Sequence, residues 1–121
     1  MKLVIAGSRD WSPTPEEIDA QFCEFLFCKA EVTEVVSGRA RGADDAGEAW
    51  AAVNGIPVKP FPANWDKYGK GAGPIRNRQM AKYADMAIVF WKNQSSGSAN
   101  MIANMAALDK PVRVVLPSGN K

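Results

Sequence analysis

Residues 61–80 read FPANWDKYGKGAGPIRNRQM, and three of the five residues before the proline at position 74 are glycines. Proline is favoured at the first position of a helix, because its fixed φ suits the helix and its missing N–H would be unpaired there. We therefore expect Gly73 to cap a helix that begins at Pro74. The first turns of that helix carry Arg76 and Arg78, where the helix dipole is already positive. Two uncompensated arginines there are unfavourable alone, so the segment predicts an anion bound among the free N–H groups.

Five short apolar runs, separated by helical patterns, predict the rest of the fold. The expected strands cover residues 2–6, 33–37, 56–61, 85–91 and 111–116. The expected helices between them cover residues 15–30, 43–53, 74–83 and 98–108. Strands that alternate with helices at this spacing form a parallel sheet with right-handed crossovers and helices on both faces. We therefore predict an α/β fold, a Rossmann-like three-layer α/β/α sandwich whose five-stranded parallel sheet has the order 3-2-1-4-5.

Local signals set the ends and the inner faces of these elements. Thr14 and Glu17 form a capping box ahead of the first helix, and we expect Ser98 to cap the last one. Two prolines place the third strand at an edge of the sheet. The apolar residues at helical spacing in the first two helices are Ile18, Phe22, Phe25, Leu26, Ala43, Ala46, Trp50 and Val53. We expect one domain over residues 1–121, with a loose tail at 117–121.

The composition excludes several classes of protein. There is no histidine among the 121 residues, which removes histidine metal sites and Ser–His or Cys–His catalysis. A net charge of +2 is too small to imply general nucleic-acid binding. Cys23 and Cys28 lie five residues apart in one expected helix, so we expect free thiols, as in a reducing cytosol. No apolar run has the length of a signal peptide or a transmembrane helix, so we expect a cytoplasmic protein without a membrane partner.

Residues suited to binding phosphate and bases gather in the loops that follow the first four strands. These loops contain Tyr68, five of the six arginines and three of the four tryptophans, namely Arg9, Arg39, Arg41, Arg76, Arg78, Trp11, Trp65 and Trp91. In a parallel sheet such loops share one edge, where ligands bind near the switch in strand order. Arginine binds phosphate in a bidentate manner, and aromatic rings can stack on a base. Each residue alone could be an ordinary loop residue, but together they predict a pocket for a phosphorylated, base-containing small molecule.

Acidic side chains lie at or near the same edge, namely Asp10, Asp44, Asp45, Glu48 and Asp66. Asp44 and Asp45 open a helix, where the dipole favours negative charge, so a structural role is one interpretation. The alternatives are binding of ribose hydroxyls, or a catalytic role as general acid or nucleophile. Ser8 and Ser37 follow strands without a basic partner, so we do not expect a serine hydrolase. The glycine pattern matches neither a Walker loop nor a GxGxxG fingerprint.

Four blocks of sequence, in order, resemble the YspA branch of the YpsA-related SLOG proteins. The blocks are GSRDW at 7–11, GRARGAD at 38–44, ANW at 63–65 together with AGPIRNRQM at 72–80, and SGSANM at 96–101. They span nearly the whole chain. The resemblance implies a Rossmann-like fold and a site for nucleotides or nucleotide-derived ligands, as in proteins of many bacteria and phages. It implies ligand-binding roles for Gly7, Arg9, Gly38, Arg41, Asp44, Arg76, Asn77, Gly97 and Ser98.

The wider superfamily includes the LOG-type phosphoribohydrolases, whose PGGxGTxxE loop carries a catalytic glutamate. In this chain the corresponding loop reads QSSGSANM at 94–101. The Gly-Thr step becomes Gly97-Ser98, and Met101 stands where the glutamate would be. The resemblance therefore supports phosphate binding at this loop and argues against LOG-type hydrolysis.

We expect a protein that binds a nucleotide-derived small molecule, as a sensor or by sequestering a signal such as a cyclic ADP-ribose-like compound. The alternative is a hydrolase of an N-glycosidic or phosphoester bond that uses Asp44 or Asp45, and a weaker alternative is single-stranded nucleic-acid binding. We expect no metal and no cofactor. Assembly into a homo-oligomer is a possibility that the sequence does not decide. The full predicted ligand-binding set is Gly7, Ser8, Arg9, Trp11, Gly38, Arg39, Arg41, Gly42, Asp44, Trp65, Gly73, Arg76, Asn77, Ser96, Gly97 and Ser98.

Overall fold

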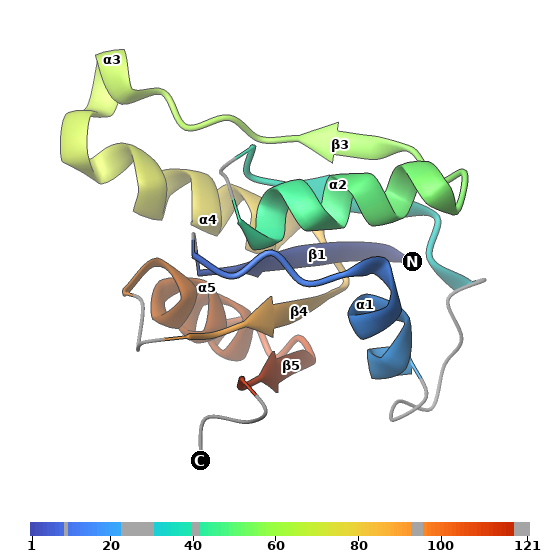
Figure 1. Cartoon of the computed structure of the whole chain (residues 1–121). Coiled ribbons are helices and arrows are strands. Elements are labelled where there is room, and N and C mark those ends of the chain that lie inside the picture. Colours follow the sequence, from blue (N-terminus) through green and yellow to red (C-terminus); the bar gives the residue numbers. More distant parts are fainter. Residues whose placement is uncertain (9, 23–30, 40–41, 93–95, 118–121) are drawn as a thin grey trace.

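Strands and helices alternate along the chain in the computed structural model (Figure 1), which describes residues 1–8, 10–22, 31–39, 42–92 and 96–117. The strands are β1 (Lys2–Gly7), β2 (Glu34–Ser37), β3 (Val58–Pro60), β4 (Met86–Phe90) and β5 (Val112–Val115). The helices are α1 (Pro15–Phe22), α2 (Ala43–Val53), α3 (Trp65–Tyr68), α4 (Ala72–Tyr83) and α5 (Ser96–Ala107), with a 3₁₀ turn at Gly69–Gly71. The expected α/β alternation is therefore confirmed.

The five strands form one parallel sheet in the order β3-β2-β1-β4-β5, as predicted. The central strand β1 pairs with β2 and β4, with Leu3 opposite Val35 on one side and Met86 on the other. β3 lies at the edge, as its two prolines indicated, although it is shorter than expected. The strand order reverses between β1 and β4, and this switch positions the site described below.

Two apolar cores lie on opposite faces of the sheet and make the fold a three-layer sandwich. Alternate residues of β1 point to opposite faces, so Leu3 and Ile5 enter one core and Val4 and Ala6 the other. The first core contains residues of α1 and α2, including the fully buried Trp50. The second contains residues of α4 and α5, namely Met80, Ala81, Met101 and Met105.

The local signals for the first two helices are mostly confirmed. The Thr14 N–H donates to Glu17 Oε1 at 2.8 Å and the Glu17 N–H donates to Thr14 Oγ1 at 3.1 Å, which is the capping box at the start of α1. Trp50 of α2 faces the core, but Val53 is 74% exposed, so its assignment to the inner face was wrong. Val53 is the last residue of α2, beyond the part that packs on the sheet. Cys23, Cys28, Phe25, Leu26 and the tail at 118–121 lie outside the described residues.

The starts of α4 and α5 differ from the prediction. Residues 65–71, expected to be loop, form α3 and the 3₁₀ turn, and α4 follows directly from Ala72 rather than from Pro74. Pro74 still fits, because the first four N–H groups of a helix have no partner within it. α5 begins at Ser96, so Ser98 lies inside the helix and is not its cap.

Candidate functional site

A cavity of about 790 Å³ lies at the carboxyl ends of β1 and β4, where the strand order switches. Its volume falls within the range of roughly 300–1,000 Å³ that is typical of small-molecule sites. The lining residues are Ala6, Gly7, Ser8, Asp10, Asp44, Trp65, Lys70, Gly73, Pro74, Arg76, Asn77, Met80, Lys92, Gly97, Ser98, Asn100 and Met101. Loops and helix starts from both halves of the sheet therefore meet at one site.

Among the described residues, helices α2, α4 and α5 begin at this cavity, as does the one-turn helix α3. Asp44 belongs to the first turn of α2, Gly73 and Pro74 to that of α4, and Gly97 and Ser98 to that of α5. The first turn of a helix offers backbone N–H groups and a partial positive charge. Three such ends around one cavity favour a ligand with negative charge.

Arg76 is the best-positioned cation of the site. Its Nε donates to Asn77 Oδ1 at 3.0 Å, and its Nη1 donates to the carbonyl oxygen of Gly38. Asn77 is buried and is itself held by α5, because its Nδ2 donates to Asn100 Oδ1 at 3.0 Å and to the Gly97 carbonyl at 3.3 Å. The guanidinium is thus fixed at the cavity wall by contacts with the loop after β2 and with its own helix.

Gly38 permits this arrangement because it has no side chain. A Cβ at position 38 would lie 2.5 Å from Arg76 Nη1 and 2.9 Å from Asp44 Oδ2, both closer than real Cβ contacts. The Arg76 guanidinium and the Asp44 carboxylate therefore lie close to each other beside Gly38. The expectation that Arg76 has no compensating charge was wrong, because Asp44 provides one from the start of α2.

The two aspartates considered as catalytic candidates have different surroundings. Asp44 is only 6% exposed and lines the cavity, whereas Asp45 is exposed and does not line it. Successive residues of a helix point in directions about 100° apart, so only one of the pair can face the cavity. Any catalytic role in this cavity therefore falls on Asp44.

The loop after β1 is packed tightly against the end of β4. A Cβ at Gly7 would lie 2.2 Å from the Phe90 carbonyl oxygen, so the strands can approach this closely only with glycine there. The Ser8 hydroxyl donates to the Lys92 carbonyl at 2.8 Å and accepts from the Lys92 N–H at 2.9 Å. Ser8 lines the cavity, but its hydroxyl proton and one of its lone pairs are used to join the two loops. Lys92 Nζ lies 3.9 Å from Asp10 Oδ2 at the same rim.

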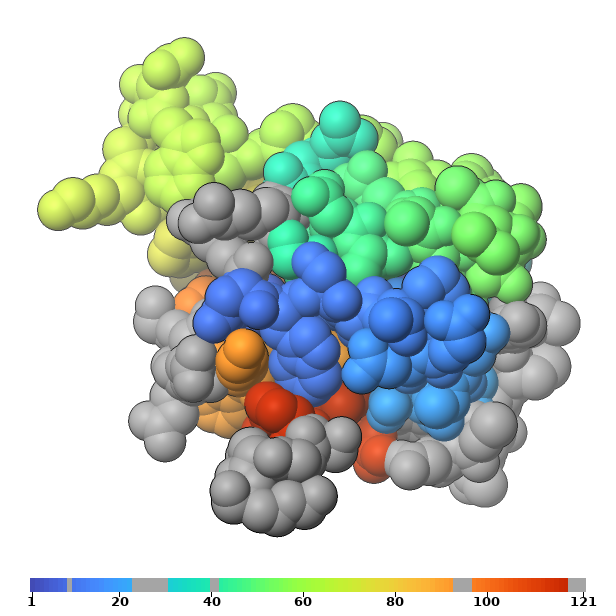
Figure 2. Space-filling model, viewed as in Figure 1, coloured from blue at the N-terminus to red at the C-terminus, as the bar shows by residue number. Residues whose placement is uncertain are grey.

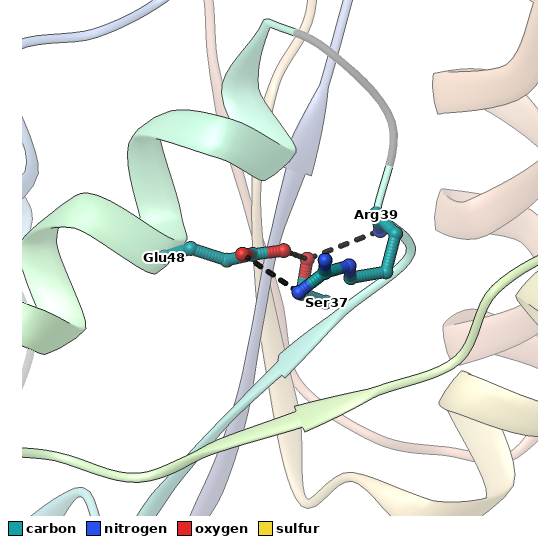
Figure 3. A network of polar contacts seen from close by, with 3 residues as sticks. All are labelled: Ser37, Arg39 and Glu48. Carbon is teal, nitrogen blue, oxygen red and sulfur yellow. Dashed lines mark hydrogen bonds and ion pairs between the residues drawn. The ribbon is translucent and has the colours of Figure 1, made fainter.

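Arg39 does not line the cavity, and its side chain lies beside Glu48 and Ser37 (Figure 3). Its Nη1 donates to Glu48 Oε1 of α2 at 3.2 Å, and its backbone N–H donates to the Ser37 hydroxyl at 3.1 Å. The Ser37 hydroxyl donates in turn to Glu48 Oε2 at 2.6 Å. Arg39 has a positive φ of 62°, and this network holds it there. Its predicted place in the site is not supported by this geometry.

The remaining predicted residues either do not line the cavity or lie outside the described residues. Trp11 packs edge-on against Phe90, with ring centroids 5.3 Å apart, and does not line the cavity. Gly42 is the buried N-cap of α2, with a φ of 84°, and Gly38 lies behind Arg76. Ser96 is the first residue of α5. Arg9 and Arg41 lie outside the described residues.

Several lining residues were absent from the predicted set, namely Ala6, Asp10, Lys70, Pro74, Met80, Lys92, Asn100 and Met101. Lys92 lies in the loop after β4, as Ser8 lies in the loop after β1, so its place in a strand-end loop was a usable signal. Asn100 and Met101 come three and four residues after Gly97, which is the spacing of one helix face. Lys70 had no such signal, because the 3₁₀ turn that carries it was not expected.

Other features of the described residues bear on the chemistry. In the described ranges, no group of three or more acidic or cysteine side chains is arranged to hold a metal ion. Nor does any helix in this part of the chain have the length and apolar character needed to cross a membrane. The Tyr83 hydroxyl, outside the cavity, donates to the Glu34 carboxylate, and this hydrogen bond together with desolvation raises the pKa of Tyr83 above its ordinary value.

A parallel sheet with a polar cavity at its strand switch defines a Rossmann-like ligand-binding domain. The chain belongs to the YspA, cpYpsA-related SLOG family, whose family model matches residues 1–68. It is 32% identical over 117 residues to the Gene 61 protein of Mycobacterium phage D29, an alignment that covers 92% of this chain and 93% of the phage protein. SLOG membership implies that the chain binds a nucleotide-derived ligand.

A solved structure supports the same fold. The chain superimposes on DNA processing protein A (DprA) of Streptococcus pneumoniae with a TM-score of 0.73 and 23% sequence identity. The match covers 99% of this chain and 52% of DprA, so the chain spans about half the length of that protein. This likeness establishes the Rossmann-like architecture.

Proposed function

We propose that the cavity binds a nucleotide or nucleotide-derived compound through its phosphate, and that the protein senses or sequesters this compound without cleaving it. The observation that carries this proposal is the position of Arg76. Its guanidinium lines the cavity and is fixed in advance by hydrogen bonds to Asn77 and Gly38. A positioned guanidinium binds phosphate with little further ordering, which strengthens binding.

The first turn of α5 supplies the second part of the anion site. Ser98 is buried at the cavity, and the space beside the Gly97 Cα is open, because a Cβ there would meet nothing within 4 Å. Backbone N–H groups at such a turn are suited to phosphate oxygens. Asn77 and Asn100 link α4 to α5 and so hold Arg76 and this turn in a fixed relation.

The rest of the cavity suits the uncharged part of a nucleotide. Met80 and Met101 line the cavity from the apolar core beneath it, in which both are almost completely buried. Asp44 provides a carboxylate that could accept hydrogen bonds from ribose hydroxyls. The lining therefore combines a few convergent polar groups with apolar surface, as ligand pockets commonly do.

Binding without cleavage is supported by the residue at the position of the LOG-type glutamate. Met101 lies in the cavity there, and a thioether neither accepts nor releases a proton at neutral pH. No histidine is present in the chain to replace it. The opposing observation is the Asp44 carboxylate, which lines the same cavity and is the residue on which the hydrolase alternative depends.

The test is calorimetric titration with AMP, ADP, NAD, ADP-ribose and cyclic nucleotides, followed by chromatography of each mixture after prolonged incubation. We expect at least one compound to bind with a stoichiometry near one and to be recovered intact. A single-stranded oligonucleotide in the same titration tests the nucleic-acid alternative. Release of a free base or of ribose phosphate over many turnovers, abolished by Asp44→Asn but not by Asp45→Asn, would establish the hydrolase instead.

A further inference from the structure

Trp65 is exposed and yet lines the cavity. The residue is 52% exposed, although tryptophan is one of the largest apolar residues. It is the first residue of α3, in the segment at residues 61–71 that projects from the body of the protein (Figures 1 and 2). In the view of Figure 2, this segment is the yellow-green protrusion at the upper left. An exposed aromatic face at the mouth of a ligand cavity has apolar surface that a bound ring could cover.

The backbone around Trp65 is ordered by several contacts. Asn64 caps α3, because its Oδ1 accepts from the Lys67 N–H at 3.1 Å, and the Gly69 N–H donates to the Trp65 carbonyl. The Trp65 ring lies along the start of α4, since its Cη2 is 3.6 Å from the position of a Cβ at Gly73. The indole is therefore held beside the anion-binding end of α4.

We propose that Trp65 is the residue that selects ligands containing a base, by stacking on that base while the phosphate lies at Arg76. This inference rests on the proposed function and adds the direction of the ligand, with its phosphate deep in the cavity and its base at the mouth. Stacking of bases on aromatic side chains is favourable for every base, because each has a π face. Trp65 then favours base-containing phosphates over phosphates without a base, and discriminates weakly among bases.

Tyr68 provides a matched control on the same short helix. It is 41% exposed, close to the exposure of Trp65, but it does not line the cavity. The Lys67 ammonium lies 5.1 Å from the centroid of its ring. If any exposed aromatic residue on α3 raised the nucleotide affinity, by stabilising the protein or by nonspecific stacking, Tyr68→Ala would weaken binding as much as Trp65→Ala does.

The experiment compares AMP, GMP, CMP and UMP with ribose 5-phosphate, by calorimetric titration of the wild type, Trp65→Ala, Trp65→Phe and Tyr68→Ala. We expect Trp65→Ala to weaken binding of the nucleotides by about 5-fold to 150-fold, the range for the loss of one stacked base. Binding of ribose 5-phosphate to this variant should be unchanged. Trp65→Phe should retain most of the nucleotide affinity, and Tyr68→Ala should retain all of it.

The outcomes separate this inference from the proposed function. Equal weakening of AMP and ribose 5-phosphate by Trp65→Ala, or no weakening of AMP, would overturn the inference and leave the phosphate site in place. The same loss in Tyr68→Ala would also overturn it. If the wild type binds neither the nucleotides nor ribose 5-phosphate, the proposed function fails and the inference fails with it.

Discussion

The loop after β2 and the first turns of α4 both carry arginines at the same edge of the sheet, but they use them differently. Arg39, in the loop after β2, pairs with Glu48 on the flank of α2, where its side chain is 54% exposed. Arg76, in α4, lies at the cavity wall between Asn77, Gly38 and the neighbouring Asp44. The comparison shows that position at the functional edge does not decide the role of an arginine. The nearest fixed acceptor decides it.

The largest expected effect separates these two arginines directly. Arg76→Ala should weaken binding of a nucleoside monophosphate such as AMP by roughly 1.5–3 kcal/mol, the range for a hydrogen bond to a charged group. We also expect the unliganded protein to lose stability, because the buried Asp44 carboxylate loses its neighbouring positive charge. Calorimetric titration and chemical denaturation measure the two effects.

Arg78→Ala is the matched control for that variant, because Arg78 lies on the same helix, is exposed and does not line the cavity. It should leave both affinity and stability unchanged. Arg39→Ala should likewise leave affinity unchanged. An equal loss of affinity in Arg39→Ala and Arg76→Ala would show that general positive charge, and not a positioned guanidinium, attracts the ligand.

The second effect concerns the network in the loop after β2. Glu48→Ala removes the acceptor of the buried Ser37 hydroxyl and the partner of Arg39. We expect the free energy of unfolding to fall by about 1–3 kcal/mol, the cost of a buried polar group left without its partner. Urea denaturation measures this change, and AMP affinity should stay the same. A loss of affinity without a loss of stability would mean that Glu48 belongs to the ligand site.

The third effect tests the contact that joins the two regions. Gly38→Ala introduces a Cβ where the Arg76 guanidinium now lies, so we expect the guanidinium to turn and to lose its bond to the Gly38 carbonyl. Affinity for AMP should fall by about 1 kcal/mol, the net value of one hydrogen bond. The stability should also fall, because the new Cβ would meet Asp44 Oδ2 as well and would move the guanidinium away from that buried carboxylate. Wild-type affinity in this variant would show that the position of Arg76 is not set by Gly38.

The smallest effect belongs to the exposed ion pair. Arg39→Ala should lower the free energy of unfolding by about 0.2–1 kcal/mol, because partly exposed salt bridges contribute little. The difference from the wild type should shrink further at high salt, where the pair is screened. A denaturation series with and without added salt measures it. A loss as large as that of Glu48→Ala would show that the guanidinium, rather than the Ser37–Glu48 bond, stabilises the loop.

The sequence was sufficient for the architecture but only partly for the site. The apolar run of β1, buried on both faces, and the capping box at Thr14 predicted their elements because the signals are local. The direction of Arg39 could not be predicted, since it depends on Glu48 being brought beside Ser37 by the packing of α2 on β2. The contact of Trp11 with Phe90 could not be predicted either, since it depends on the packing of segments that are distant in the sequence. The glycine-rich run at 69–73 was interpreted as loop, and its weak helical propensity hid the 3₁₀ turn that brings Lys70 to the cavity.

The pair of hydrogen bonds between Ser8 and Lys92 offers a built-in reporter of occupancy. The amide proton of Lys92 is held by the Ser8 hydroxyl at the cavity rim, so its exchange with deuterium requires the two loops to separate. A compound bound against both loops would oppose that separation and slow the exchange, whatever its chemical identity. The signal of one backbone amide could therefore be used to search for the natural ligand in mixtures of unknown composition.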